Sequence, residues 1–124
     1  MPIYQLGEDL VFPSPYLAED DGLLAVGGDL SPQRLLLAYS NGIFPWYNEG
    51  EPILWHAPNP RFVLYPQKFK LSKSLERLYK QKRYKITCNQ DFENVVKNCQ
   101  QVEREDEFDT YIMNHMFEAY CNLF

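Results

Sequence analysis

The fold is decided by DGLLAVGGDLSP (residues 21–32), followed by GIFPW (residues 42–46) and PILWHAPNPR (residues 52–61). Glycine permits positive φ and close backbone approach, whereas proline fixes φ and removes a hydrogen-bond donor. Aromatic residues stand between these glycines and prolines. The three stretches therefore predict a rigid surface built from turns, which can hold aromatic rings at fixed positions.

A short, mostly buried helix is predicted to follow the first stretch. Ser31 is the expected N-cap and Pro32 the first helical residue. Asn41-Gly42 provides the stop signal. The glycine pair at residues 27–28 fits neither G-x-G-x-x-G nor a phosphate loop with Gly-Lys-Ser/Thr, so we interpret it as a tight turn leading into the helix.

Residues 43–60 contain four prolines, which predicts loop and short strands. Residues 61–65 are a strand candidate that ends at Pro66. Ser72 or Ser74 is expected to cap a helix that continues to about Gln81. The apolar residues of that helix, which we expect to be buried, are Leu75, Leu78 and Tyr79.

Residues 84–88 alternate as a half-buried strand does, and Asn89 is the expected cap of the next helix. The i, i+3, i+4, i+7 spacing in that segment places four residues on one face of the helix: Phe92, Val95, Val96 and Cys99. We expect residues 101–109 to form an acidic connection. A final helical stripe contains Met113, Met116, Phe117, Tyr120 and Phe124. This stripe reaches the last residue without a stop signal, so we expect the chain to be cut within a longer pattern.

Length and composition restrict the class of protein. A chain of 124 residues is one domain, or a small domain with part of another, and 45% hydrophobic content argues against disorder. No run approaches the roughly 20 apolar residues of a membrane helix, and the N-terminus does not resemble a secretory signal. Three scattered cysteines predict free thiols in a reducing cytoplasm. Two histidines are too few for a zinc site with these cysteines, so we expect no metal.

Basic residues are concentrated in the middle of the chain. Residues 67–100 hold nine Lys or Arg and three Asp or Glu, whereas the segments on both sides are acidic. One interpretation is a solvated helix face. The other is a surface that contacts the phosphates of a polyanion such as a nucleic acid. The candidate phosphate-contacting residues are Lys73, Arg77, Lys80, Lys82 and Arg83.

Trp46 follows Phe44-Pro45 in the loop region. Core packing is the usual role of such a ring. The alternative is a platform on which a nucleobase stacks, because the proline beside it would hold the indole in place before a ligand arrives.

In order and spacing, these stretches, together with FPSP (residues 12–15), resemble the leucyl/phenylalanyl-tRNA–protein transferase family. The resemblance is strongest from residue 12 to residue 61 and continues, more weakly, through residue 123. Family members are considerably longer, and their second domain is similar to the acetyltransferase-like (GNAT) fold. The resemblance therefore implies an α+β chain, with a small N-terminal α/β domain at residues 1–62 and an incomplete GNAT strand-helix segment at residues 63–124.

The resemblance also implies an activity. Family members move leucine or phenylalanine from an aminoacyl-tRNA to a protein whose N-terminus is Arg or Lys, which marks that protein for the N-degron pathway. No nucleotide cofactor or metal is implied, and the expected location is the cytoplasm. The family's catalytic carboxylate and amide lie downstream of position 124. We therefore expect these 124 residues to bind tRNA without catalysing transfer by themselves.

Three aromatic residues match family positions that bind the aminoacyl-tRNA. Trp46 matches one of two rings that stack on the terminal adenosine. The second ring lies in the family's Gly-Thr-Trp-Ile, which reads Asp109-Thr110-Tyr111-Ile112 here, so Tyr111 offers a smaller stacking face. Tyr120 matches a position near the substrate.

Two other functions remain open from the sequence. One is a non-enzymatic RNA-binding or regulatory module that keeps the N-terminal scaffold. The other is a protein-interaction domain, in which the apolar stripe of residues 113–124 meets another chain.

Overall fold

The structure, a computed structural model, describes residues 3–103 and 112–124 as a mixed α/β chain. Within these ranges it contains one four-stranded sheet, four α-helices and two short 3-10 helices, at Pro15–Leu17 and Pro66–Lys68. The predicted mixture of helices and strands is confirmed. The chain forms two compact units. The sheet unit comprises the described parts of Met1–Asn59 and Phe92–Phe124, and the middle unit is Pro60–Asp91.

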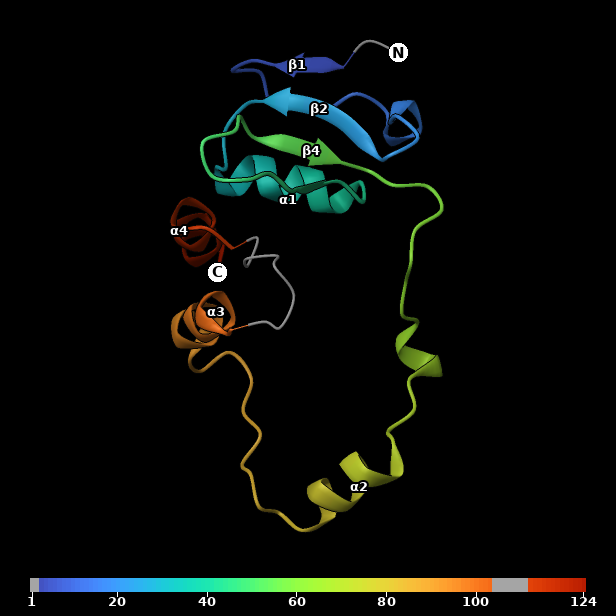
Figure 1. Ribbon diagram of the computed structural model, residues 1–124, viewed down its shortest axis with the longest axis vertical. Helices are drawn as coiled ribbons and strands as arrows, with labels where there is room; N and C mark the ends of the chain where they lie inside the picture. Colours follow the sequence, from blue (N-terminus) through green and yellow to red (C-terminus); the bar gives the residue numbers. More distant parts are fainter. Residues whose placement is uncertain (1–2, 104–111) are drawn as a thin grey trace. The chain divides into compact units, whose positions relative to one another are not determined.

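The sheet unit is built on strands in the order β1-β2-β4-β3 (Figure 1). β1 (Tyr4–Leu6) runs parallel to β2 (Leu23–Gly27). β4 (Leu54–His56) runs antiparallel to β2 and to β3 (Phe44–Pro45). The prediction of loop and short strands for residues 43–60 is therefore confirmed.

Helix α1 (Pro32–Ser40) begins at the residue that the sequence predicts. The Ser31 hydroxyl accepts a hydrogen bond from the Arg34 N–H at 3.3 Å, and Asn41 is the C-cap. Such a cap satisfies one of the N–H groups that have no partner inside the helix. The prediction that α1 is mostly buried holds for the side that faces the core, whereas Leu36 is 59% exposed.

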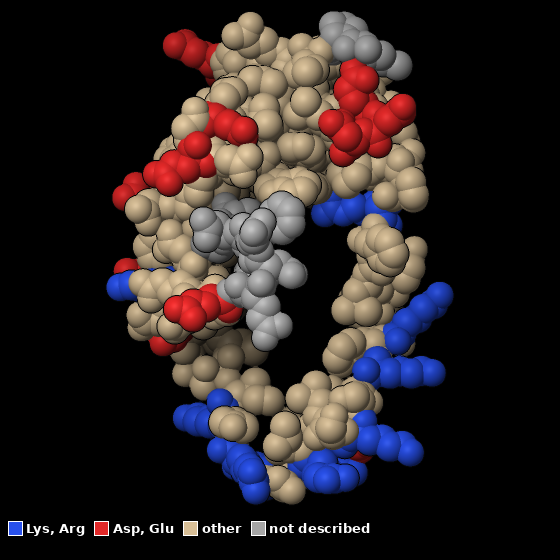
Figure 2. All heavy atoms as spheres, viewed as in Figure 1, with Lys and Arg blue, Asp and Glu red and all other residues tan. Residues whose placement is uncertain are grey.

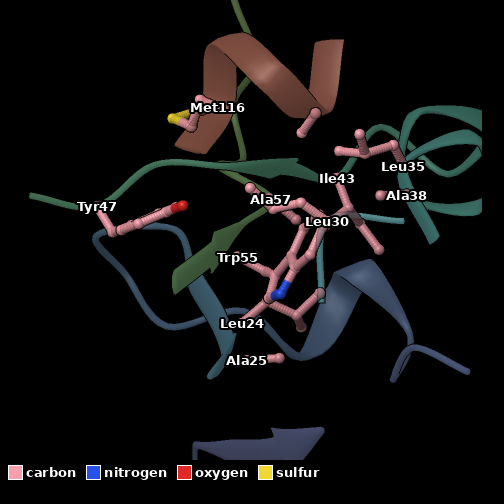
Figure 3. Close-up of a cluster of buried hydrophobic side chains, with 11 residues drawn as sticks. Leu24, Ala25, Leu30, Leu35, Ala38, Ile43, Tyr47, Trp55, Ala57 and Met116 are labelled. Carbon is pink, nitrogen blue, oxygen red and sulfur yellow. The ribbon is translucent and has the colours of Figure 1, made fainter. Parts of the chain in front are cut away.

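Trp55 lies at the centre of the core of the sheet unit (Figure 3). Its indole is fully buried, and Nε1 donates to the carbonyl oxygen of Gly27 at 2.9 Å. The ring of Phe12 meets it edge-on, with centroids 4.9 Å apart. The other core side chains come from β2, α1, the loops and α4: Leu24, Ala25, Leu30, Leu35, Ala38, Ile43, Tyr47, Ala57, Met116 and Ala119.

Arg34 connects α1 to the N-terminal segment. Its side chain is 1% exposed, and Nη2 donates to the carbonyl oxygens of Gly7 at 2.8 Å and Asp9 at 3.2 Å. Nε lies 3.3 Å from the carboxylate of Asp29. Gly28, with φ of +74°, lies so close that an added Cβ would meet the guanidinium at 3.0 Å. One buried cation therefore ties α1 to two loop segments, residues 7–9 and residues 28–29.

Helices α3 (Phe92–Gln101) and α4 (Asn114–Leu123) complete the sheet unit. α4 packs against α1, and α3 packs against α4 (Figure 1). The rings of Phe92 and Phe124 stack in parallel with centroids 4.4 Å apart. The sequence predicted both helices, and both predictions are confirmed. The predicted N-cap of α3 is wrong, because α3 begins at Phe92, whereas Asn89 lies three residues earlier with a positive φ of 56°.

The middle unit, all of whose residues are described, contains one α-helix, α2 (Lys73–Lys80), and no strand. The Ser72 hydroxyl accepts from the N–H of Leu75 at 3.3 Å, which confirms the predicted helix and its cap. The expected burial is wrong, because Leu75, Leu78 and Tyr79 are 48%, 39% and 64% exposed. This unit offers no sheet or second α-helix that could cover them.

The strands predicted at residues 61–65 and 84–88 are also wrong, since neither segment is a strand in the structure. Alternating apolar residues favour a strand only when a neighbouring strand satisfies the backbone hydrogen bonds. Neither segment pairs with another strand in this structure.

We expect Arg34→Leu to lower the free energy of unfolding by about 1.5–3 kcal/mol, because two carbonyl oxygens lose a charged donor. Urea denaturation followed by circular dichroism measures this change. Gln33→Leu, at an exposed position of the same helix, is the matched control and should stay within about 0.5 kcal/mol of the parent chain. Equal stability of the two variants would contradict the role given to Arg34.

Candidate functional site

Trp46 directly follows β3 and projects away from the core. Pro45 is buried opposite Trp55, so alternation along the strand turns Trp46 to the other face. The Trp46 N–H donates to the carbonyl oxygen of Leu54 at 2.9 Å, which holds the backbone. The indole is 56% exposed. Of the two interpretations of Trp46, the structure therefore contradicts core packing.

A row of three rings lies on this outer face of β3 and β4. His56 pairs across the strands with Phe44, and their ring planes are stacked with centroids 6.1 Å apart. Trp46 tilts against His56 with centroids 5.5 Å apart. Burial lowers the pKa of His56 below its ordinary value of 6.5, and the Asp21 carboxylate acts in the opposite direction. The middle ring of the row is therefore mostly neutral at neutral pH.

Tyr47, the residue after Trp46, joins this loop to α4. Its ring is buried, and its hydroxyl lies 3.2 Å from Nδ1 of His115 in the first turn of α4. Burial raises the pKa of the Tyr47 hydroxyl, so the group stays protonated at neutral pH. The loop beside Trp46 is thus held by a side chain as well as by the sheet.

Tyr120 is half-buried on α4 and contacts α1. Its hydroxyl lies 2.8 Å from the hydroxyl of Tyr39, so the two phenols share a hydrogen bond. Trp46 and Tyr120 both belong to the sheet unit, but the ring of Trp46 meets His56 whereas Tyr120 bonds to Tyr39. Tyr111, the third predicted aromatic residue, lies outside the described residues.

The five predicted phosphate-contacting residues all belong to the middle unit, and all are exposed. Lys73, Arg77 and Lys80 lie on α2, and Lys82 and Arg83 follow it. Lys80 pairs with Glu76 at 2.8 Å, an exposed contact that contributes little to stability. Figure 2 shows Lys and Arg side chains gathered on this segment. The segment can therefore present several cations to one polyanion.

Within residues 3–103 and 112–124, no group of three or more His, Cys, Asp or Glu side chains could hold a metal ion. The three cysteines are free thiols. No helix in the described ranges is long and apolar enough to cross a membrane.

Several residues near the site were not predicted. His56, Tyr47, His115 and Tyr39 gain their importance from tertiary contacts, two of which join residues 68 and 81 positions apart. His56 could have been nominated from the sequence because it follows Trp55, and a buried residue in a strand turns its neighbour outward.

Two family models match this chain. The leucyl/phenylalanyl-tRNA protein transferase N-terminal domain matches residues 28–59, and the leucyl/phenylalanyl-tRNA protein transferase model matches residues 63–124. The chain is 52% identical, over 121 residues, to a Flavobacterium johnsoniae protein named leucyl/phenylalanyl-tRNA–protein transferase. It is also 52% identical, over 123 residues, to a protein of that name from Desulfatibacillum aliphaticivorans.

These matches cover almost all of this chain, 98% and 99%, but only 57% and 53% of the two relatives. The chain belongs to the leucyl/phenylalanyl-tRNA–protein transferase family, which confirms the resemblance seen in its sequence. It spans about half the length of the curated relatives that it matches.

The lowered pKa of His56 predicts a pH dependence of stability. The unfolded chain binds the His56 proton more readily than the folded chain does, so the free energy of unfolding falls as pH drops below 6.5 toward the folded-state pKa. His56→Phe removes this contribution. Urea denaturation at about pH 7.5 and about pH 5.5 should show a smaller loss in the variant, and equal losses would contradict the assignment.

Proposed function

We propose that this chain forms the tRNA-binding part of an aminoacyl-tRNA–protein transferase. The full-length protein would move leucine or phenylalanine from charged tRNA to a protein with an N-terminal Arg or Lys. The observation that carries the proposal is the match of two successive family models to residues 28–59 and 63–124. The exposed indole of Trp46 supports it.

The reaction is aminolysis of an ester. The acceptor's α-amine must lose a proton and attack the ester carbonyl, and the oxyanion that forms must be stabilised. The tRNA ester is already activated, so placing it beside the amine supplies much of the rate. Placement of the 3′ end is the part of the reaction that we assign to these residues. The carboxylate and amide that handle the proton are expected in the part of the relatives that this chain does not match.

Trp46 is the proposed stacking surface for the terminal adenine. A base and an aromatic ring that stack contribute about 1–3 kcal/mol to binding. The ring is exposed while its backbone is fixed by the sheet, so the main chain loses little conformational entropy when the base binds. Tyr111 is the proposed second ring, and Tyr120 is proposed to lie near the same ligand.

The basic residues of the middle unit are proposed to contact tRNA phosphates. Such contacts orient a nucleic acid without reading its sequence, and they release counterions. The exposure of all five side chains supports this role.

We also propose that residues 63–124 are the opening part of an acetyltransferase-like domain that follows a small domain at residues 1–62. The support is the place where the two family matches meet, between residues 59 and 63. A cytoplasmic location and an N-degron role belong to the same proposal, and the three free thiols are consistent with a reducing compartment.

Binding of phenylalanyl-tRNA by the 124-residue protein tests this function. We expect Trp46→Ala to weaken binding by about 1–3 kcal/mol, because the base loses its stacking partner. Tyr16→Ala, which removes an 88% exposed ring elsewhere in the sheet unit, is the matched control and should bind as the parent does. The same samples, incubated with an Arg-initiated peptide, should transfer no labelled phenylalanine. Unchanged affinity of a folded Trp46→Ala variant would contradict the proposed site, and transfer would contradict a role limited to binding.

The salt dependence of binding tests the basic residues. Reversing Lys80, Lys82 and Arg83 to Glu should reduce the slope of log affinity against log salt by about one for each phosphate that the protein no longer neutralises. The matched control replaces Lys80 and Lys82 by Arg and Arg83 by Lys. These changes keep the charge and should therefore keep the slope. An unaltered slope after charge reversal would favour a solvated surface.

A further inference from the structure

We propose that His56 is a positioning residue for Trp46, and that its imidazole holds the indole in the orientation that receives the terminal base. The inference rests on the proposed function, because it concerns the same surface. It gives His56 a part in binding, although this ring does not itself stack on the base.

The sheet fixes His56 from two sides. In the strand register His56 lies opposite Leu23 of β2 and opposite Phe44 of β3. The next residue, Ala57, donates its N–H to the carbonyl oxygen of Gly22 at 2.7 Å. Phe44 also stacks on the imidazole. The backbone of His56 is therefore held by the sheet, and its half-buried ring is flanked by the ring of Phe44.

Trp46 has a fixed backbone but a mostly exposed side chain. Its N–H is bonded to Leu54, yet 56% of the residue is open to solvent. An indole with free torsions loses conformational entropy when a base stacks on it, and this loss weakens binding. A neighbour that restricts the indole beforehand reduces that loss.

The contact between Trp46 and His56 suits this role. The ring centroids are 5.5 Å apart and the planes are inclined by 55°. Rings at this separation attract each other more when their planes are inclined than when they lie face to face, because ring faces are electron-rich and ring edges are electron-poor. The contact leaves more than half of Trp46 exposed, so support from His56 and stacking of a base are compatible.

Three substitutions separate ring support from other effects of position 56. Binding of phenylalanyl-tRNA to the full chain is the readout. His56→Ala and His56→Gln, which remove the ring, should weaken binding by about 2- to 10-fold, the cost of fixing one large side chain. His56→Phe keeps a ring and should remain within about twofold of the parent. Equal affinity of all three variants and the parent would overturn the inference.

A double-mutant cycle identifies the residue through which His56 acts. In a Trp46→Ala background, His56→Ala should cause no further decrease in affinity. The same decrease in both backgrounds would overturn the inference, because His56 would then act independently of Trp46. If Trp46→Ala alone leaves binding unchanged, the proposed function fails as well. If Trp46→Ala weakens binding and His56→Ala does not, only the present inference fails.

Tryptophan fluorescence tests the inference without tRNA. Trp55 is fully buried, so acrylamide quenching reports mainly on Trp46. His56→Ala and His56→Gln should lower the anisotropy of the accessible indole, and His56→Phe should preserve it. Unchanged anisotropy in the ring-deleted variants would overturn the inference. Stronger acrylamide quenching of Trp55 in one variant would show that this variant has lost its fold. The other ring-deleted variant, His56→Ala or His56→Gln, then provides the comparison.

Discussion

The hydrogen bond from the buried indole of Trp55 to the carbonyl oxygen of Gly27 sets the geometry of the candidate site. It anchors β4 against the end of β2. Because neighbouring side chains of a strand point to opposite faces, burial of Trp55 turns His56 outward. Pro45, which pairs with Trp55, turns Trp46 outward in the same way. A register shift of one residue would exchange the two faces and remove the row of rings from the outer face.

The two units offer different means of recognising a nucleic acid. In the sheet unit an aromatic surface is held by strand pairing, by the Tyr47–His115 hydrogen bond and by packing of α4 on α1. In the middle unit cations stand on an exposed helix and the residues after it. Stacking requires a ring held at a defined position, whereas charge attraction acts over a Debye length of about 8–10 Å and tolerates mobility. The division of work proposed for the transferase follows this physical difference.

The sequence was most informative where local chemistry determines structure. Ser31 and Pro32 specify the start of α1, and Ser72 specifies the start of α2, because a cap depends on residues only a few positions apart. Strands at 61–65 and 84–88 were wrongly predicted, since pairing depends on distant segments. The contacts of His56, Tyr47 and Tyr120 could not be predicted for the same reason. Trp46 could be nominated from its family motif and its proline neighbour, while its exposure required the register of β3 and β4.

The crowding around Gly28 has a consequence for how this part of the chain can vary. Its φ is positive, and an added Cβ would stand only 3.0 Å from Nε of Arg34. Replacement by alanine would thus strain the main chain and at the same time press against a cation whose partners lie in two loop segments. A smaller residue at position 34 would relieve the crowding but not the backbone strain at position 28, and the N-terminal segment would then lose the charged donor that holds the carbonyl oxygens of Gly7 and Asp9.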